Sequence, residues 1–246
     1  MSGHSKWSTI KRKKEATDSK RASIFTKIGR EIAVAVREGG GDPAANSKLK
    51  DVIAKAKANN VPNDNIDRII KKSIGDEEKN SYVEMVYEGY GPSGVAVMVE
   101  ALTDNKNRTA GDLRHYFDKH GGNLGQSGSV SFMFEPKGII VIDNEDNKIS
   151  EDKIFEDALL DGVQDIKYEE GAIEIQTDPV SLRAVKDALE GLGYSFMSAE
   201  VEQVPNTYSK IEDPELVLKM YKLIDMLEEN DDVQEVYHNW DMPEEE

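Results

Sequence analysis

One stretch of the chain, residues 138–204, follows a pattern that few folds satisfy. An apolar strand and an amphipathic helix come first, and two strands with alternating apolar residues, a second helix and a final strand follow. Turn residues separate these elements at Glu169-Glu170-Gly171 and at Asp178-Pro179. The order β-α-β-β-α-β is that of a ferredoxin-like sandwich. The pattern therefore predicts a ferredoxin-like domain over residues 138–204.

The C-terminal segment contains an apolar helix face that it cannot bury by itself. Asp213-Pro214 begins an amphipathic helix, and a short strand follows near Val233–Tyr237. One helix and one strand cannot cover such a face. We therefore expect residues 205–246 to return to residues 79–137 and to complete a discontinuous α/β domain, into which residues 138–204 are inserted. Before the insertion, the sequence predicts strands over Tyr82–Glu88, Val95–Leu102 and Ser129–Phe134 and a helix over Arg108–Lys119.

Residues 1–78 are predicted to form a basic domain of three helices. Gly39-Gly40-Gly41 ends one amphipathic helix, and Asp42-Pro43 supplies a cap and a fixed φ for the next. A third helix runs from about Pro62 to Gly75. The expected fold class is thus α+β, with an N-terminal three-helix domain followed by two α/β domains, one ferredoxin-like and inserted into the other.

Charge is distributed unevenly along the chain. The 246 residues carry a net charge of −17, which by itself would repel nucleic acid. Residues 1–75 nevertheless hold 17 Lys and Arg against 8 Asp and Glu. Such asymmetry indicates an element that binds a polyanion, either DNA or RNA. The alternative is that the basic and acidic parts of the chain attract each other.

The first thirty residues carry most of the candidate phosphate contacts. Several such contacts release condensed counterions together and give strong, salt-sensitive binding. Trp7 either stacks on an exposed base or packs this basic arm onto the helical bundle. The loop Asn105–Arg108 either contacts RNA or merely begins the following helix. The predicted nucleic-acid-binding residues are Lys6, Trp7, Lys11, Arg12, Lys13, Lys14, Lys20, Arg21, Lys27, Arg30, Lys106 and Arg108.

No motif in the sequence supports catalysis, a metal site or a cofactor. The chain has no cysteine, which excludes thiolate chemistry and suits a reducing cytoplasm. His115 and His120 lie five positions apart on one predicted helix, so their side chains do not converge on one metal ion. No apolar run approaches the length of a membrane span. We therefore expect a cytoplasmic, non-enzymatic protein without catalytic residues, metal, cofactor or membrane partner.

Two glycine-rich segments need separate interpretations. Gly89–Gly94 leads into a strand rather than a helix, which favours a hairpin turn over a phosphate-binding loop. Residues 121–128 form a longer polar segment that is either a binding surface or a hinge between domains.

Several short motifs match those of one known family. They are Gly3-His4-Ser5-Lys6-Trp7, Ile24-Phe25-Thr26-Lys27, Gly39-Gly40-Gly41-Asp42-Pro43, Tyr87-Glu88-Gly89-Tyr90-Gly91-Pro92, Thr103-Asp104-Asn105-Lys106-Asn107-Arg108-Thr109 and Lys119-His120-Gly121-Gly122-Asn123-Leu124-Gly125. In this order they resemble the YebC family of bacterial proteins, and Val233–Asn239 looks like the end of that family. Ser93 stands where many members have glycine.

The resemblance implies a helical N-terminal domain, two α/β domains and a non-enzymatic regulator. Members of the family are described as probable transcriptional regulators that bind DNA. Mitochondrial relatives are described as translational activators, and bacterial relatives have been linked to ribosomes stalled on proline-rich sequences. The resemblance therefore supports nucleic-acid binding and supplies no catalytic residue.

Two functions remain open at this point. The first is DNA-binding transcriptional regulation, which the family's usual description favours, although no helix-turn-helix motif is recognisable. The second is a translation factor that contacts ribosomal RNA through the basic domain. The acidic remainder of the chain fits the second function at least equally well, because it would be repelled along a bare duplex. We predict a nucleic-acid-binding regulator of gene expression, with DNA as the first candidate target and the ribosome as the alternative.

Overall fold

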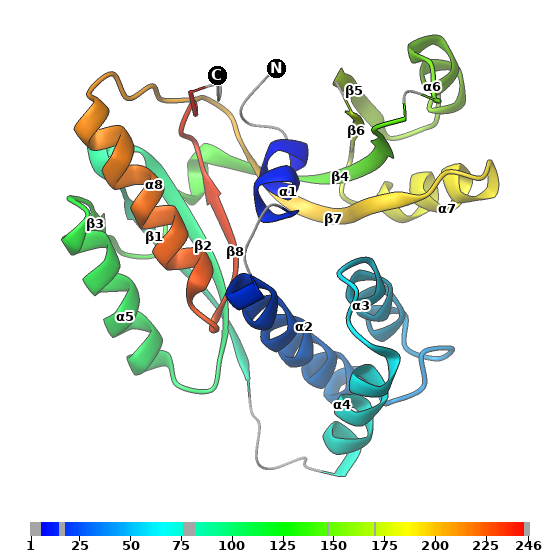
Figure 1. Cartoon of the computed structure of the whole chain (residues 1–246), viewed down its shortest axis with the longest axis horizontal. Helices are drawn as coiled ribbons and strands as arrows, with labels where there is room; N and C mark the ends of the chain where they lie inside the picture. Colours follow the sequence, from blue (N-terminus) through cyan, green and yellow to red (C-terminus); the bar gives the residue numbers. More distant parts are fainter. Residues whose placement is uncertain (1–5, 15–17, 76–81, 147, 170, 244–246) are drawn as a thin grey trace. The chain divides into compact units, whose positions relative to one another are not determined.

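The computed structural model describes residues 6–14, 18–75, 82–146, 148–169 and 171–243, although the side chains of residues 8, 12–14 and 18–21 lie outside that description. Helices and two four-stranded sheets make up these segments (Figure 1). The chain divides into two compact units. One contains residues 1–15, 133–210 and 240–246, and the other contains residues 16–132 and 211–239. None of the described helices is long and apolar enough to cross a membrane.

A bundle of three helices begins the second of these units. The helices are α2 (Asp18–Gly39), α3 (Ser47–Ala58) and α4 (Asn63–Gly75). Their apolar sides meet in a core that includes Ile28, Ile32, Leu49, Val52 and Ile66. The expected bundle of three N-terminal helices is therefore confirmed, whereas the bounds of a separate N-terminal domain remain a prediction.

Asn46 connects the end of α2 to the start of α3. Its Oδ1 accepts a hydrogen bond from the backbone N–H of Leu49 at 3.0 Å, which caps α3. Its amide nitrogen donates to the carbonyl oxygens of Ala35 and Gly40 at 2.7 and 2.8 Å. Gly40 has a φ of 82°, the left-handed conformation expected after a helix C-terminus.

A sheet with strand order β3-β1-β2-β8 completes this unit. Its strands are β1 (Val83–Tyr90), β2 (Ala96–Thr103), β3 (Asn123–Leu124) and β8 (Val233–His238). Because β8 pairs antiparallel with β2, the C-terminal segment adds an edge strand to a sheet begun more than a hundred residues earlier. This pairing supports the discontinuous α/β domain expected from the sequence. The boundaries of that domain remain a prediction.

Two helices pack together beside this sheet. They are α5 (Lys106–Lys119) and α8 (Pro214–Glu229), which lie side by side (Figure 1). Leu113 and Phe117 of α5 are buried, as are Met220, Leu223 and Leu227 of α8. The apolar face that the tail cannot bury alone is therefore covered within this unit.

Ser93 has an unusual backbone conformation in the turn between β1 and β2. It contains a short 3-10 helix, η1 (Pro92–Gly94), in which Ser93 has a φ of 58°. Residues with a Cβ atom rarely adopt this conformation, whereas glycine adopts it without strain. A glycine would therefore fit this turn better than Ser93.

The sheet of the other unit has the strand order β5-β6-β4-β7. Its elements in chain order are β4 (Phe134–Asn144), α6 (Glu151–Asp157), β5 (Val163–Glu169), β6 (Gly171–Thr177), α7 (Leu182–Gly191) and β7 (Phe196–Pro205). Ile140, Ile142, Ile173 and Ile175 pack on one face with residues of both helices. This arrangement confirms the ferredoxin-like prediction.

Local predictions failed where elements are short. The strand expected over Ser129–Phe134 is wrong, because a 3-10 helix, η2 (Ser131–Met133), precedes β4. The two-residue strand β3 was not expected at all. The helix expected over Arg108–Lys119 begins at Lys106, because Asn105 caps it two residues earlier.

Candidate nucleic-acid interface

The basic arm forms a helix, α1 (Lys6–Lys14), that packs on the ferredoxin-like sheet. Trp7 is 5% exposed and lies in a small core with Ile139, Val141 and Ala172. Trp7 therefore packs inside the protein, which was one of its two interpretations. The surface that it covers, however, belongs to β4 and β6 rather than to the helical bundle. The indole is buried in this arrangement.

Lys6 fixes the start of this helix by two interactions. Its Nζ lies 2.5 Å from Oε1 of Glu202, and its backbone N–H donates to Oε2 of Glu174 at 2.7 Å. The second contact places a carboxylate at the helix N-terminus, where the helix dipole favours negative charge. Lys6 thus attaches the arm to an acidic sheet face, whereas Lys11 is exposed. Arg12, Lys13 and Lys14 follow in α1, and their side chains lie outside the described residues.

Two other predicted cations bind groups near the start of β8. Nζ of Lys27 donates to the carbonyl oxygen of Glu228 at 2.5 Å. Arg30 donates to Oδ1 of Asp232 at 2.5 Å and to the carbonyl oxygen of Leu102 at 3.0 Å. Its guanidinium carbon also lies 5.2 Å from the centre of the Tyr82 ring, within range of a cation–π interaction.

Arg108 meets the same carboxylate from the first turn of α5. Its Nη2 lies 2.8 Å from Oδ2 of Asp232 and 2.8 Å from Oδ1 of Asp104. Thr109 donates to Oδ2 of Asp232 at 2.7 Å, and Thr103 donates to the same atom at 3.3 Å. We call Arg30, Thr103, Arg108, Thr109 and Asp232 the Asp232 cluster.

Asp232 is charged within this cluster although its side chain is only 5% exposed. Burial alone would raise its pKa, but hydrogen bonds from Arg108, Thr109 and Arg30 outweigh burial and lower the pKa to about 2. The hydrogen bonds that Arg108 donates to Asp232 and Asp104 raise the pKa of Arg108. Sequence reasoning missed Asp232, because its partners are up to 202 positions away and its neighbourhood contains many other carboxylates.

The Asn105–Arg108 loop begins a helix, which was one of its two interpretations. Oδ1 of Asn105 accepts from the backbone N–H of Arg108 at 3.1 Å. Lys106 is exposed, and its carbonyl oxygen accepts from the Tyr87 hydroxyl at 3.3 Å. Contact of this loop with RNA stays a prediction. Lys20 and Arg21 lie in α2, and their side chains are outside the described residues.

Other exposed cations lie on α3 and α4, and the predicted set omitted them. Lys50 and Lys57 are seven positions apart and therefore share one side of α3. Lys48 and Lys55 lie on the opposite flank and form ion pairs with Glu38 and Glu31. The exposed lysines that make no ion pair within the described part of this bundle are Lys50, Lys57, Lys71 and Lys72. The seven-residue spacing on α3 was visible in the sequence.

The glycine-rich segment 121–128 is attached to β1 by Glu88, which is 6% exposed. The Glu88 carboxylate accepts hydrogen bonds from the backbone N–H groups of Gly128, Val130 and Ser131, each at 2.8 Å. Burial alone would raise the pKa of Glu88, but these N–H groups outweigh burial and lower it. The segment is thus an ordered surface loop, whose role in binding stays a prediction.

The three histidines that the structure describes, His115, His120 and His238, are not arranged as metal ligands. In the described segments, no group of three or more His, Cys, Asp or Glu side chains could hold a metal ion. His115 is exposed, while His120 is buried just after α5. Burial lowers the pKa of His120, and the nearby charges of Lys119 and Lys222 lower it further.

The fold is that of an α+β protein with a basic helical bundle, an α/β sheet completed by the chain's C-terminal segment, and an acidic ferredoxin-like sandwich. Residues 5–76 match the model of the TACO1/YebC protein N-terminal domain, and residues 82–240 match that of the TACO1/YebC second and third domain. The chain belongs to the TACO1/YebC family.

Similar proteins extend over nearly the whole chain. A protein from Ruminiclostridium cellulolyticum named "Probable transcriptional regulatory protein" is 58% identical over 245 residues, which cover 100% of this chain and 98% of that protein. A protein of the same name from Acetivibrio thermocellus is 57% identical over 240 residues, with 98% and 99% coverage. The crystal structure of the conserved hypothetical protein Aq1575 from Aquifex aeolicus shares the fold with a TM-score of 0.84, at 45% identity and 93% coverage of each chain.

Proposed function

We propose that this protein is a non-enzymatic, cytoplasmic regulator of gene expression that binds nucleic acid through its basic N-terminal region, with DNA-binding transcriptional regulation as its function. The observation that carries the proposal is a set of exposed cations in an otherwise acidic protein. They comprise Lys11 on the arm and Lys50, Lys57, Lys71 and Lys72 on the bundle. The names of the relatives, probable transcriptional regulatory proteins, support the regulatory role.

The cations of the predicted binding set are not equally suited to bind phosphate. Lys6, Lys27, Arg30 and Arg108 already contact carboxylate or carbonyl oxygens. A phosphate would have to displace these oxygens, some of them buried, before it could bind to any of the four side chains. We therefore propose two separate sets of phosphate contacts, one on the run Lys11–Lys14 and one on the lysines of α3 and α4.

A fourfold alanine variant of Lys11, Arg12, Lys13 and Lys14 tests the contribution of the arm. Binding to duplex DNA should weaken, and the slope of log affinity against log salt should fall by up to about 0.9 for each phosphate that the arm no longer neutralises. The control variant changes Lys148, Lys153, Arg183 and Lys210 to alanine, which removes the same charge outside the basic region. Equal effects of both variants would show that only net charge matters.

A second fourfold variant changes Lys50, Lys57, Lys71 and Lys72 to alanine. All four side chains are exposed on helices, so the fold should be retained. If the bundle contributes to binding, this variant also flattens the salt dependence, and its effect adds to that of the arm variant. An unchanged slope would restrict the interface to the arm.

The second candidate function is that of a ribosome-associated translation factor that contacts ribosomal RNA. The observation in its favour is the acidity of residues 138–204, which hold 17 Asp and Glu against 5 Lys and Arg. A long duplex repels such a domain, whereas a ribosome presents both RNA and basic protein to the chain. The single variant Lys106→Ala tests the start of α5, since Lys106 is exposed and lies outside the Asp232 cluster.

Direct competition separates the two functions. Purified protein at physiological salt is offered a promoter fragment, an unrelated duplex of equal length, and ribosomes. A transcriptional regulator prefers its site over the unrelated duplex by about a thousandfold or more. A translation factor binds both duplexes weakly and alike, and sediments with ribosomes in a salt-sensitive manner.

A further inference from the structure

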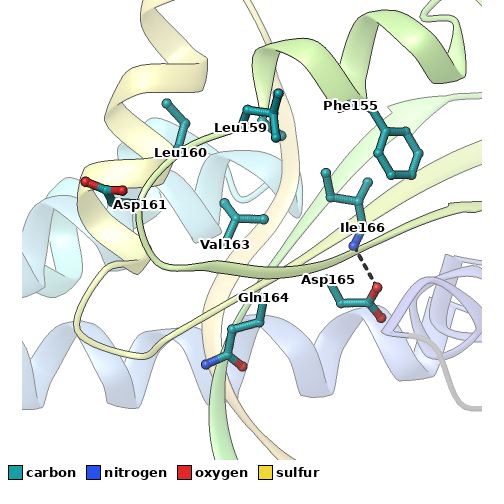
Figure 2. A pocket seen from close by; sticks show the side chains of 9 residues that line it. Phe155, Leu159, Leu160, Asp161, Val163, Gln164, Asp165 and Ile166 are labelled. Atoms are coloured by element: carbon teal, nitrogen blue, oxygen red, sulfur yellow. Dashed lines mark hydrogen bonds between the residues drawn. The ribbon is translucent and has the colours of Figure 1, made fainter.

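A groove on the ferredoxin-like domain exposes large apolar side chains. It lies beside the C-terminal end of α6 and the edge strand β5 and has a volume of about 390 Å³ (Figure 2). Leu159, two residues beyond the end of α6, is 82% exposed, and Phe155 of α6 is 42% exposed, although Ile154 of α6 is fully buried. Val163 and Ile166 line the same groove from β5. Exposed apolar patches of this kind on soluble proteins often mark sites of interaction.

The backbone that presents Leu159 is held in place by its own hydrogen bonds. The N–H of Leu160 donates to the carbonyl oxygen of Ala158 at 2.8 Å. The N–H of Asp178 donates to the carbonyl oxygen of Gly162, also at 2.8 Å. Gly162 has a φ of 90°, and a Cβ atom there would lie 2.2 Å from Ser181. The exposure of Leu159 therefore follows from a defined turn.

The surroundings of the groove are strongly acidic. Between residues 151 and 166 there are six carboxylates and one lysine. That lysine, Lys153, lies 2.7 Å from Asp157. Asp161 and Asp165 line the groove itself and are exposed. This charge repels nucleic acid, an anionic membrane and a second copy of a chain whose net charge is −17.

The basic arm of this chain packs elsewhere on the same domain. Trp7 and Ile10 of α1 pack with Ile139 and Val141, whereas the adjacent residues Ile140 and Ile142 face the core beneath α6 and α7. Successive side chains of a strand point to opposite faces of the sheet. The groove beside α6 is thus on the helix-covered side, and α1 is on the other.

We infer that this groove is a docking site for a lysine- and arginine-rich segment of a partner protein. Such a segment places one or two large apolar side chains against Phe155 and Leu159 and directs its cations toward Asp161 and Asp165. It docks through side chains rather than by adding a strand to β5, because the N–H of Ile166 already donates to Oδ1 of Asp165 at 3.0 Å (Figure 2). Charge complementarity selects the partner, and the apolar contact fixes its position.

Three synthetic peptides offered to the full-length ¹⁵N-labelled protein test this inference by NMR titration. They are KLKKFKKLK, the analogue KSKKSKKSK of the same charge, and the acidic ELEEFEELE. Burial of one large apolar side chain corresponds to about tenfold or more in affinity. KLKKFKKLK should therefore bind at least about tenfold more tightly than its serine analogue, and ELEEFEELE should not bind. Shift changes should centre on residues 155–166.

Two single variants make the test specific. Leu159→Ser should reduce the affinity for KLKKFKKLK about tenfold. Val180→Ser should leave it unchanged, because Val180 is 89% exposed on the same domain but does not line the groove. Both positions are exposed, so both variants should give the amide spectrum of a folded protein.

Several results would overturn the inference. Equal affinity for KLKKFKKLK and its serine analogue would show that non-specific charge attraction alone explains the binding. Shift changes remote from the groove, or equally weakened binding in both variants, would place the peptide elsewhere. Self-association of the wild-type chain that Leu159→Ser abolishes would identify a second copy as the occupant. Binding to anionic vesicles that the same variant abolishes would identify a membrane.

Discussion

Replacing Asp232 by asparagine removes one buried charge and keeps the size of the side chain. The pKa of Asp232 is about 2 rather than 3.8, because Arg108, Thr109 and Arg30 donate to its carboxylate. That difference corresponds to roughly 2 kcal/mol of unfolding free energy at neutral pH. Asp232→Asn should therefore destabilise the unit that contains residues 16–132 and 211–239 by about 2 to 3 kcal/mol, because two guanidinium groups then face a neutral amide.

The pH dependence of this destabilisation has a defined sign. A carboxylate whose pKa is lowered in the folded state stabilises the fold above its unfolded pKa, which is near 3.8. The stabilisation disappears as the pH falls from about 4 through about 2. The difference between Asp232→Asn and the wild type should accordingly be largest at pH 7 and should shrink toward zero near pH 2.

Two optical signals separate the units in this assay. Both tryptophans, Trp7 and Trp240, belong to the unit that contains the ferredoxin-like sheet, while most of the helices belong to the other. Urea unfolding followed by circular dichroism at 222 nm should therefore shift in Asp232→Asn, and tryptophan fluorescence should not. The matched control is Asp231→Asn, because Asp231 is exposed and accepts a hydrogen bond from Ser23 at 3.1 Å.

The reasoning would be refuted if Asp232→Asn lost less than about 0.5 kcal/mol at pH 7, or lost no more than Asp231→Asn. A destabilisation that stayed constant down to pH 2 would show that shape, rather than charge, explains the effect.

Three further changes test other parts of the structure. Glu88→Gln should speed amide exchange at the backbone N–H groups that Glu88 binds and cost about 1 to 3 kcal/mol; unchanged protection would show that the loop is ordered without Glu88. Trp7→Ala should expose the arm to exchange and proteolysis, because it removes the buried anchor of α1; an arm as protected as in the wild type would contradict this. Excision of residues 138–204 from a chain that also lacks the arm should leave a folded remainder, whereas deletion of residues 206–246 should unfold the sheet that contains β8. Stable folding of residues 80–136 alone would refute the discontinuous domain.

Patterns that repeat within one element could be predicted from the sequence. The alternation and turn residues of 138–204 predict the succession of strands and helices along the chain, because each of its strands is long enough to show a period of two. The C-terminal helix was expected to pack on another segment, because its apolar face has no cover nearby. By contrast, β3 contains two residues, too few for any periodicity to appear.

Pairings between distant residues could not be predicted in the same way. Arg30 and Arg108 look like phosphate ligands in a basic stretch and a polar loop, and no local signal relates them to Asp232. The sequence supports base stacking and internal packing of Trp7 equally well. Only the tertiary structure shows that Trp7 packs on Val141 and Ala172. The number of positive charges was visible in the sequence, but their availability to phosphate depends on which carboxylates the fold brings near them.

Crosslinking in living cells tests most directly whether this protein binds nucleic acid. The wild-type chain and the fourfold alanine variant of Lys11–Lys14 are crosslinked and purified, and the bound DNA and RNA are sequenced. We expect enriched DNA sites for the wild type and their disappearance in the variant. Enrichment of ribosomal RNA alone would replace transcription by the translation alternative. Recovery of neither nucleic acid above the level of the variant would contradict nucleic-acid binding itself.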